Sequence, residues 1–393
     1  MRLVYWQYYF TPPGGWGNRR SYDLARYWQA QGLEVWILAG GTYFPPALRA
    51  HLHGRRCFRT PEGVPVVYLP TPYHQKRRLG ERVLDWVRFS LWSAALLWRW
   101  RRKRIALIAT VPPPFLVWLA WLRKKILGLP YAVELYDAWP AIPEAMGAVP
   151  ALLRGPLRWL SRLAYREASL CVALSPSIRE TLGLKQAYLS YNGTRPSLFR
   201  RRSHPPFLPF RVVYAGTFGR VNHLTFLLEV AQRLQDYPAI EFWLIGDGAE
   251  KPLLLQKAQH LPRVRFLKPV PVEEVPYYLS LCHIGVSTVL PIPLLETNSA
   301  NKFYDYLATG LVVGLNYGGW QAALLEEAGC GFSARTPEGF AEGILRYYWD
   351  RRAWERAADR ARRLAERLFD RRRLAQELVP QLEKAFFHPT HLA

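Results

Sequence analysis

The segment 298–310, with the sequence NSANKFYDYLATG, combines a lysine and an aspartate at helical spacing. Lys302 and Asp305 stand three positions apart, so a helix that begins near Lys302 presents both on one side. A cation in the first turn is unfavourable against the helix dipole, and a bound anion would offset this cost. An aspartate one turn further on is suited to accept hydrogen bonds from the sugar hydroxyls of a nucleotide. The pattern therefore predicts a nucleotide site, with an exposed Lys–Asp pair as the alternative.

Two glycine-rich turns follow apolar segments that we predict to be strands. The first, TPPGGWGNRR, contains Gly14 and Gly15, and the second, YAGTFGR, contains Gly216 and ends at Arg220. Glycine lets backbone N–H groups approach a ligand, and the N-terminus of the next helix attracts anions. A guanidinium beside the second turn suits a diphosphate because it can contact two oxygens at once. The alternatives are a tight connection for the first turn and a solvated arginine at the start of a helix for the second.

A third candidate lies in VELYDAWP, where a predicted buried strand ends at Asp137 and Trp139. Carboxylates at the carboxyl ends of parallel strands face the ligand crevice of open α/β sheets. Asp137 can therefore orient or deprotonate an acceptor hydroxyl, and Trp139 can stack on a sugar ring. The alternative is that the aspartate caps the following helix.

Several other classes of site have no counterpart in the sequence. It contains no Asp-x-Asp, no HExxH and no histidine pair at metal-binding spacing, so a metal-dependent mechanism is not indicated. The motifs GxxxxGK[ST], GxSxG and GxGxxG are also missing, which argues against a P-loop and a dinucleotide-dependent dehydrogenase. The four cysteines lie far apart without CxxC spacing, as expected for a reduced, cytoplasmic protein. The N-terminus resembles a strand rather than a signal peptide.

The chain is strongly basic, with 53 Lys and Arg against 30 Asp and Glu. Such an excess attracts polyanions or anionic membranes, unless it reflects solubility or genome composition. The segment 76–104 holds ten basic and two acidic residues. Apolar residues recur between them at helical spacing: Val83, Val87, Leu91, Ala94 and Trp98. We hypothesise that this segment docks on an anionic membrane near a lipid-linked acceptor; the alternative is a domain helix whose apolar face belongs to the core.

Short apolar strands alternate with amphipathic helices along the 393 residues, which predicts parallel sheets in an α/β protein. Three prolines in 203–210 interrupt the pattern, so we predict domains at 1–203 and 204–370 and a C-terminal helix, 371–393, that packs on the first domain or bridges both. For the helix near Lys302 we predict Ser299 or Asn301 as the N-cap and Gly310 as its end. The predicted strands are 3–9, 34–39, 65–69, 105–110, 131–136, 170–174, 188–191, 211–215, 241–245, 263–267, 284–288, 312–315 and 331–333.

The order of these motifs resembles that of a known enzyme family. QYYFTPPGGWGNRRSYDLARYWQAQGLEVWIL, ELYDAWP and YNGTRPSLF precede YAGTFGR, LIGDGAEK and NKFYDYLATGLVVGLNYGGW. Together they are similar to retaining GT-B glycosyltransferases of family 4, and the nearest group is bacterial enzymes of surface-polysaccharide assembly. The resemblance extends to about residue 350. It implies two Rossmann-like domains whose parallel sheets face a central cleft, with the donor bound mainly on the second.

The resemblance also implies roles for individual residues. Arg220 and Lys302 match residues on the donor diphosphate, and Asp305 takes the place of a carboxylate, usually glutamate, that binds the ribose. An earlier glutamate of the family falls on Thr297, with Glu296 beside it, and Tyr136 stands where arginine is common. The further donor-site candidates are Gly14, Gly15, Gly216, Lys268, Val270 and Asn301. Asp137 matches the family's aspartate and is the catalytic candidate, and Arg20 and Trp139 are the acceptor candidates.

The sequence thus predicts a metal-independent, retaining glycosyltransferase. It would move a hexosyl group from a nucleotide-diphosphate sugar to an acceptor hydroxyl in surface-polysaccharide or glycolipid synthesis, without a cofactor. We expect it in the cytoplasm or peripherally on the inner face of the cell membrane. The alternatives are a sugar-nucleotide epimerase of the same architecture and a non-catalytic polyanion-binding module. Since no nucleic-acid motif is present, we expect no nucleic-acid partner.

Overall fold

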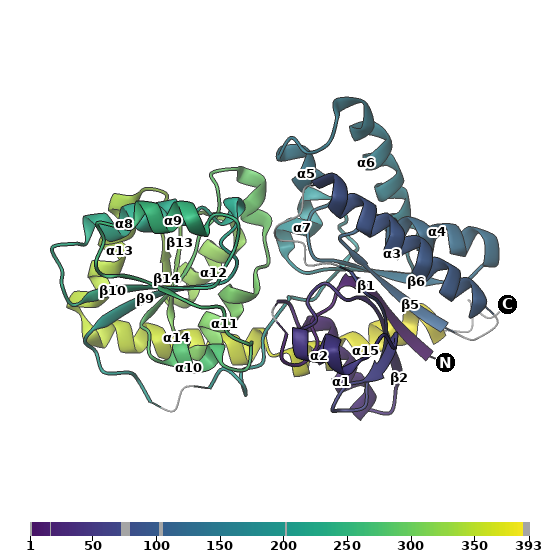
Figure 1. The fold of residues 1–393 in the computed structure, drawn as a ribbon, viewed down its shortest axis with the longest axis horizontal. Helices are drawn as coiled ribbons and strands as arrows, with labels where there is room; N and C mark the ends of the chain where they lie inside the picture. Colours follow the sequence, from purple (N-terminus) through teal and green to yellow (C-terminus); the bar gives the residue numbers. More distant parts are fainter. Residues whose placement is uncertain (1, 16, 72–78, 102–104, 201–202, 388–393) are drawn as a thin grey trace. The chain divides into compact units, whose positions relative to one another are not determined.

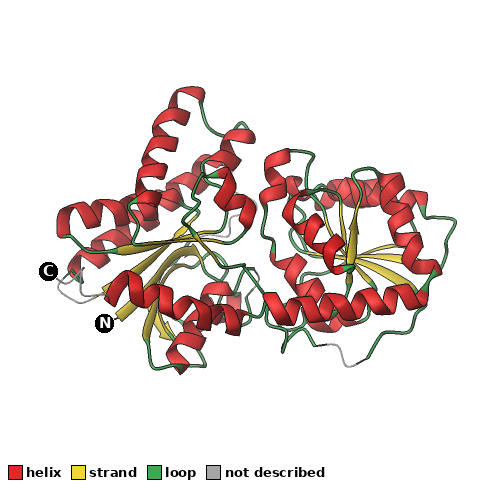
Figure 2. Ribbon diagram, turned by 180° about the vertical axis from the view of Figure 1, so that it is seen from behind, coloured by secondary structure: helices red, strands yellow, loops and turns green. Residues whose placement is uncertain are grey.

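The computed structural model describes residues 2–15, 17–71, 79–101, 105–200 and 203–387. The chain divides into two compact units (Figures 1 and 2). The first unit contains Met1–Asn192 together with Arg371–Ala393, and the second contains Gly193–Asp370. Among the described residues, no helix is both long enough and apolar enough to span a bilayer.

The first unit is built on an eight-stranded sheet with the order β3-β4-β2-β1-β5-β6-β7-β8. Neighbouring strands are parallel, except that β3 runs antiparallel to β4. The central strands are apolar along their length because helices cover both faces of the sheet. The strands are β1 (Arg2–Tyr9), β2 (Glu34–Gly40), β3 (Cys57–Arg59), β4 (Pro65–Leu69), β5 (Ile105–Val111), β6 (Tyr131–Leu135), β7 (Leu170–Ala173) and β8 (Tyr188–Leu189).

Two helical layers enclose this sheet. On one face α1 and α15 contribute Trp28, Leu378 and Leu382 to the core. Helices α3, α4 and α6 lie on the other face (Figure 1). They contribute Phe89, Leu116 and other buried side chains to the core. The helices are α1 (Arg20–Ala30), α2 (Pro46–His51), α3 (Leu79–Arg99), α4 (Pro114–Leu127), α5 (Ala141–Ala145), α6 (Ala151–Arg166), α7 (Pro176–Thr181) and α15 (Arg371–Phe387).

The second unit contains a six-stranded, fully parallel sheet with the order β11-β10-β9-β12-β13-β14. Its strands are β9 (Phe210–Ala215), β10 (Ile240–Ile245), β11 (Val264–Leu267), β12 (Ile284–Ser287), β13 (Val312–Leu315) and β14 (Gly331–Ser333). Its helices are η2 (Arg220–Asn222), α8 (Leu224–Arg233), α9 (Lys251–Lys257), α10 (Val275–Ser280), η3 (Pro293–Thr297), α11 (Asn301–Thr309), α12 (Gly319–Ala328), α13 (Pro337–Trp349) and α14 (Arg351–Leu368).

The predicted α/β class with parallel sheets is confirmed in both units. All thirteen predicted strands are present, with ends that differ by at most two residues. The antiparallel edge strand β3 was not predicted, because only three residues form it and two of them are exposed. Between Arg351 and Phe387 the chain forms two helices: α14 packs against α11, and α15 packs against α1.

The boundary between the units lies after Asn192 and not after residue 203. The proline-rich segment belongs to the second unit, since the rings of His204 and Phe207 pack against Trp354, with centroids 5.1 and 5.7 Å away. The chain instead crosses at Gly193, which has a φ of +68°. A glycine adopts this left-handed conformation without steric cost.

Candidate functional site

The strand order of the second unit reverses between β9 and β12. In open parallel sheets, the loops at the carboxyl ends of two such strands part and leave a crevice that commonly binds a ligand. Here the two loops are fastened to each other. The Thr288 hydroxyl donates a hydrogen bond to the Asn222 carbonyl (2.5 Å), and the Leu290 N–H donates to the Val221 carbonyl (2.9 Å). The second glycine turn and α11 flank this point.

Helix α11 begins at Asn301, with Ala300 as its N-cap and no side-chain cap. The prediction that Ser299 or Asn301 caps it is therefore wrong. The Ser299 hydroxyl is 2.6 Å from that of Tyr304, with which it shares a hydrogen bond, and Asn301 lies inside the first turn. The predicted end is confirmed, since Gly310 is the C-cap with a φ of +75°.

Contacts with the sheet fix the position of α11. The Ala215 N–H, at the end of β9, donates to the Tyr306 hydroxyl (2.8 Å). Gly285 on β12 leaves room for the ring, because a Cβ at this position would lie 2.3 Å from Tyr306 Cγ. The first turn of the helix is thereby held over the ends of β9 and β12.

Lys302, in that first turn, extends over the glycine turn after β9. Its Nζ donates to the Tyr214 hydroxyl (3.1 Å) and to Asn222 Oδ1 (3.2 Å), and it lies 4.5 Å from the centre of the Tyr214 ring. Gly216 makes this possible, since a Cβ there would be 3.1 Å from Lys302 Cε. Burial lowers the pKa of Lys302 to about 8. Both hydrogen-bond partners are neutral, so an anion would stabilise this ammonium.

Arg220 is exposed and opens the short helix η2, whose last residue, Asn222, contacts Lys302. The two predicted diphosphate residues thus lie at the same end of the same sheet. The neighbouring loop after β10 supports the turn between them: the Phe218 N–H donates to the Asp247 carbonyl (2.9 Å). Gly246 must be small here, because a Cβ would lie 1.9 Å from the Gly216 carbonyl oxygen.

Asp305 lies one turn further along α11 and is partly exposed. Its carboxylate accepts a hydrogen bond from the Thr194 hydroxyl (2.6 Å). Thr194 is itself buried, and its N–H donates to the Phe369 carbonyl (2.8 Å), so the hydroxyl is held in place. Sequence reasoning missed Thr194; the signal was its position directly after the Asn-Gly turn in YNGT.

Other candidates of the second unit follow β11 or precede α11. Lys268 and Val270 follow β11, at the carboxyl edge of the sheet; Lys268 is exposed and Val270 is partly buried. The Thr297 hydroxyl donates to the Leu294 carbonyl (2.7 Å). The neighbouring Glu296 is paired with Arg335 (2.6 Å), beside the glycines that open α12. Glu296 therefore lies one position before Thr297, on which the resemblance places a glutamate of the GT-B family.

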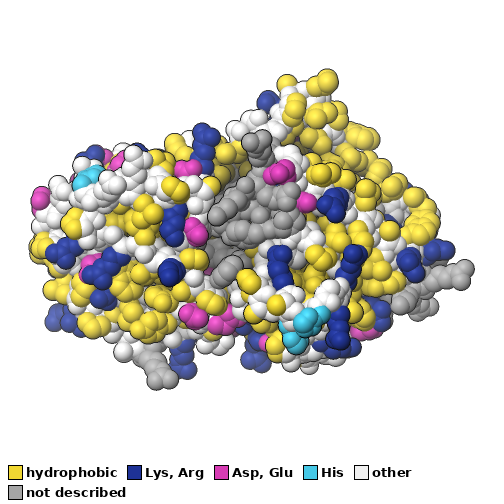
Figure 3. Space-filling model, viewed as in Figure 1, with side chains coloured by type: hydrophobic (Ala, Val, Ile, Leu, Met, Phe, Trp, Pro, Cys, Tyr) yellow, Lys and Arg dark blue, Asp and Glu magenta, His cyan; other side chains and the backbone are white. Residues whose placement is uncertain are grey.

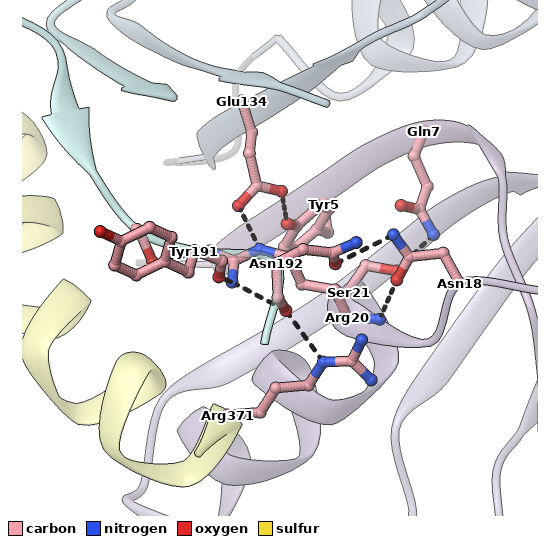
Figure 4. Close-up of polar contacts among 10 residues, drawn as sticks. Tyr5, Gln7, Asn18, Arg20, Ser21, Glu134, Tyr191, Asn192 and Arg371 are labelled. Carbon is pink, nitrogen blue, oxygen red and sulfur yellow. Dashed lines mark hydrogen bonds and ion pairs between the residues drawn. The ribbon is translucent and has the colours of Figure 1, made fainter. Parts of the chain in front are cut away.

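In the first unit, the interpretation of Arg20 as an acceptor-binding residue is wrong, because its guanidinium is completely buried. Figure 4 shows the polar contacts that it makes there. Its Nε is 2.8 Å from Glu134 Oε1, and its Nη2 donates to the Ser190 hydroxyl (2.9 Å). Nη1 donates to the Tyr191 carbonyl. The sequence signal for this ion pair was Glu134, which lies inside the apolar segment VEL, since a buried carboxylate needs a buried cation.

The residues around Arg20 also bind Asn192, at the point where the chain leaves the first unit. Asn18 Nδ2 donates to Asn192 Oδ1 (3.0 Å), and Arg371 Nε donates to the Asn192 carbonyl (3.1 Å) (Figure 4). Arg371 also forms a buried ion pair with Asp23 (2.9 Å). Residues from the first helix, the crossing segment and the last helix are thus joined by one polar network, which the sequence did not reveal.

The other first-unit candidates lie at the carboxyl ends of β1 and β6. Gly14 is exposed with a φ of +75°, and Gly15 must lack a side chain because a Cβ would be 2.7 Å from the Tyr43 carbonyl oxygen. Asp137 lies two residues beyond β6, and burial raises its pKa to about 6. The Trp139 ring packs edge-on against Trp86, with centroids 6.2 Å apart.

No group of three or more His, Cys, Asp and Glu side chains suited to a metal ion occurs in the part of the chain that the structure describes. The cationic groups of the candidate site are instead Lys302 and Arg220. They lie where the turn after β9 meets the first turn of α11. The arrangement can therefore bind a dianionic group, and Asp305 can bind a neighbouring polyol.

Comparison with known proteins gives two family matches. Residues 17–187 match the family described as glycosyl transferase 4-like domain, and residues 209–350 match glycosyl transferases group 1. No curated protein matches the chain by sequence.

Solved structures share the fold at low sequence identity. Anabaena Alr3699/HepE in complex with UDP-glucose has a TM-score of 0.71 at 16% identity, with 98% of this chain and 99% of that chain covered. Sucrose-phosphate synthase from Thermosynechococcus elongatus has a TM-score of 0.75 at 13% identity, with the same coverage. WaaG, a glycosyltransferase involved in lipopolysaccharide biosynthesis, has a TM-score of 0.65 at 12% identity, with 99% and 100% covered. The fold and the two family matches together show that the chain belongs to the glycosyltransferases of the GT-B fold.

Proposed function

We propose that the protein transfers a hexosyl group from a nucleotide-diphosphate sugar to an acceptor hydroxyl, with retention of configuration and without a metal ion. The observation that carries the donor assignment is Lys302, a partly buried cation with only neutral hydrogen-bond partners at the start of α11. Arg220 opens η2 at the same end of the sheet. The complexes of similar proteins with UDP-glucose and UDP support a nucleotide donor.

In this proposal the negative charge that develops on the leaving diphosphate is stabilised by fixed groups. The Lys302 ammonium, the Arg220 guanidinium and the positive end of the α11 helix dipole supply positive charge where a metal ion would otherwise act. The Asp305 carboxylate, positioned by its hydrogen bond from Thr194, binds the ribose hydroxyls. The retaining outcome is an expectation from the family resemblance.

The acceptor would bind on the first unit. Asp137 is ionised at neutral pH, since its pKa is about 6, and can orient an acceptor hydroxyl or take up its proton. Trp139, two residues later, is partly exposed and can contact the sugar ring of the acceptor. We propose a lipid-linked saccharide as the acceptor and surface-polysaccharide or glycolipid synthesis as the role. The likeness to WaaG supports this assignment.

The pH dependence of donor binding tests the role of Lys302. Its pKa of about 8 in the free protein must rise when a diphosphate binds, because the anion stabilises the protonated form. Affinity is therefore full below pH 8 and falls as the pH rises above it. We expect the Kd for UDP, measured by isothermal titration calorimetry, to increase about tenfold between pH 7 and pH 9. Lys302→Arg stays charged and should abolish this dependence; a profile unchanged by the substitution would contradict the assignment.

Removal of the Thr194 hydroxyl tests the ribose site. Thr194→Val keeps the shape of the side chain but removes the hydrogen bond that positions the Asp305 carboxylate. We expect the Kd for UDP to rise about tenfold, as for the loss of a hydrogen bond to a charged group, and Thr194→Ser to restore it. The Kd for inorganic pyrophosphate, which has no ribose, should not change. An equal loss for UDP and pyrophosphate would show that the substitution disturbs the whole site.

A thermal-shift screen against nucleotide sugars with different bases tests the function as a whole. We expect one base and sugar to stabilise the protein most strongly. Incubation of that sugar nucleotide without acceptor should leave it largely intact. Its conversion to an isomer would indicate an epimerase instead. If no nucleotide sugar stabilises the protein and it binds nucleic acid with a steep salt dependence, the chain is a polyanion-binding module.

A further inference from the structure

The exposed hydrophobic side chains of the first unit are concentrated on three helices. Every large, exposed hydrophobic side chain in its described part lies on α3, α4 or α6. These residues are Val83, Leu84, Leu91, Trp98, Leu122, Ile126, Leu152, Leu153 and Trp159, and we call them the three-helix surface. In the second unit, the corresponding residues are spread over separate elements: Leu208, Val221, Leu253, Leu255, Tyr277 and Trp349.

The three helices lie side by side on one face of the eight-stranded sheet, with α4 in contact with both α3 and α6 (Figure 1). Their inner faces already supply the core, for example through Phe89 and Leu116. On α3 the exposed residues Leu84, Leu91 and Trp98 are seven positions apart, so they form a single stripe on the outer side. Figure 3 shows hydrophobic side chains gathered over this part of the molecule. The exposed hydrophobic side chains of the three helices are therefore not needed to build the core of the first unit.

A shallow apolar depression of about 280 Å³ joins the helices. Val87 and Leu91 line it from α3, Trp118 and Leu122 from α4, and Leu160 from α6. Soluble monomers seldom expose such continuous apolar surface unless something covers it.

The charge of the surrounding residues indicates what covers this surface. Helices α4 and α6 carry no acidic residue and six basic residues that are at least partly exposed: Lys124, Lys125, Arg154, Arg158, Arg162 and Arg166. Two of these six form ion pairs with residues outside the two helices, Lys125 with Glu167 and Arg158 with Glu144. Arg162 and Arg166 are exposed beside Trp159. A second copy of the chain would bring like charges together, whereas anionic headgroups would neutralise them. Helices that combine arginine, lysine, tryptophan and leucine in this way lie in the interface of a bilayer.

We propose that the three-helix surface docks on an anionic lipid bilayer, with its leucine and tryptophan side chains among the lipid chains and its basic residues at the headgroups. The proposal extends the hypothesis made for 76–104, of which the basic residues 76–78 and 102–104 lie outside the described residues. It adds α4 and α6 to the contact surface. A surface that docks on lipid would bring the first unit to a lipid-linked acceptor; that last step rests on the proposed function.

Flotation of the full chain with vesicles tests the docking. We expect the protein to float with vesicles of phosphatidylcholine and phosphatidylglycerol (3:1) at 150 mM salt and to remain unbound with phosphatidylcholine alone. Trp159→Ala and Leu152→Ser should each weaken binding to the mixed vesicles at least tenfold, because both side chains are among the most exposed of the surface, at 66% and 87%. The matched controls on the second unit, Trp349→Ala and Leu255→Ser, should bind as the unaltered protein does.

Replacement of arginines tests the electrostatic part separately. Arg162→Gln combined with Arg166→Gln should lower binding to the mixed vesicles about 25-fold, or about fivefold for each charge. The same change at Arg352 and Arg363, which are exposed on α14, should have no effect. The Kd for UDP should stay constant in all these variants, so a failure of docking is distinguishable from a failure of the donor site.

Three outcomes would overturn the proposal. The first is that the protein does not float with the mixed vesicles. The second is that the control variants lose as much binding as the variants of the three-helix surface. The third is that sedimentation velocity shows a dimer that Trp159→Ala dissociates while vesicles do not bind, which would make this surface an interface between two copies.

Discussion

Lys302→Ala lowers the kcat/KM for the donor about 10²- to 10³-fold while the second unit remains folded. The size is that expected for removal of one fixed group that stabilises charge on a leaving group. Arg220→Ala, which removes the second cation, should also cause a severe loss. The measurement is the steady-state rate of transfer with the donor that the thermal-shift screen identifies.

The stability of the Lys302 variant separates this effect from misfolding. Burial lowers the pKa of Lys302 from 10.5 to about 8, so the charged ammonium is less favourable in the folded state than in the unfolded chain. Its removal should therefore leave the melting temperature unchanged or raise it slightly. Lys257→Ala and Arg352→Ala, at exposed positions of the same unit, are the controls and should keep full activity. If Lys302→Ala and Arg220→Ala both retain near-normal rates, the diphosphate assignment is wrong.

Glu134→Ala destabilises the first unit by about 3–5 kcal/mol, as expected when one partner of a buried ion pair is removed. The substitution leaves the Arg20 guanidinium buried without its carboxylate and takes away the acceptor of the Tyr5 hydroxyl (Figure 4). Urea unfolding followed by circular dichroism measures the change.

An exposed ion pair of the same sheet provides the comparison. Glu34 pairs with Arg2 at 2.6 Å, but its side chain is 55% exposed, so Glu34→Ala should cost less than about 1 kcal/mol. Arg20→Met combined with Glu134→Leu should recover much of the stability that Glu134→Ala loses, because an apolar pair needs no charge compensation. If Glu134→Ala and Glu34→Ala lower the free energy of unfolding equally, the buried pair contributes no more to stability than the exposed pair.

The regular part of the fold was predictable because each buried parallel strand is a short apolar run between polar turns. β5, for example, is buried at all seven positions, and its sequence, IALIATV, is apolar except for one threonine. The glycine turn at Gly216 was predictable for the same reason, since it follows such a strand. The helix at Lys302 was predictable from the helical spacing of Lys302 and Asp305 and from Gly310 at its end. The turn and the helix lie close together because the strand order of the sheet reverses between β9 and β12.

The polar network around Arg20 was not predictable from local patterns. Its members come from β1, α1, β6, the segment after β8 and α15, and what joins them is their common burial rather than their spacing. Arg20 and Lys302 illustrate the difference. Both stand in the first turn of a helix, but Arg20 has a buried carboxylate as its partner, whereas the hydrogen-bond partners of Lys302 are neutral. The sequence alone does not distinguish a cation that is paired with a buried carboxylate from one whose hydrogen-bond partners are neutral.

The position of α15 sets the order in which the protein can be completed during translation. Ala375, Leu378 and Leu382 lie in the core against α1, and the Trp28 indole N–H donates to the Ala375 carbonyl (2.9 Å). A ribosome therefore finishes the whole second unit before it supplies the helix that closes the first. Until then the nascent chain exposes the apolar side of α1, which makes chaperone binding or aggregation a risk at this stage.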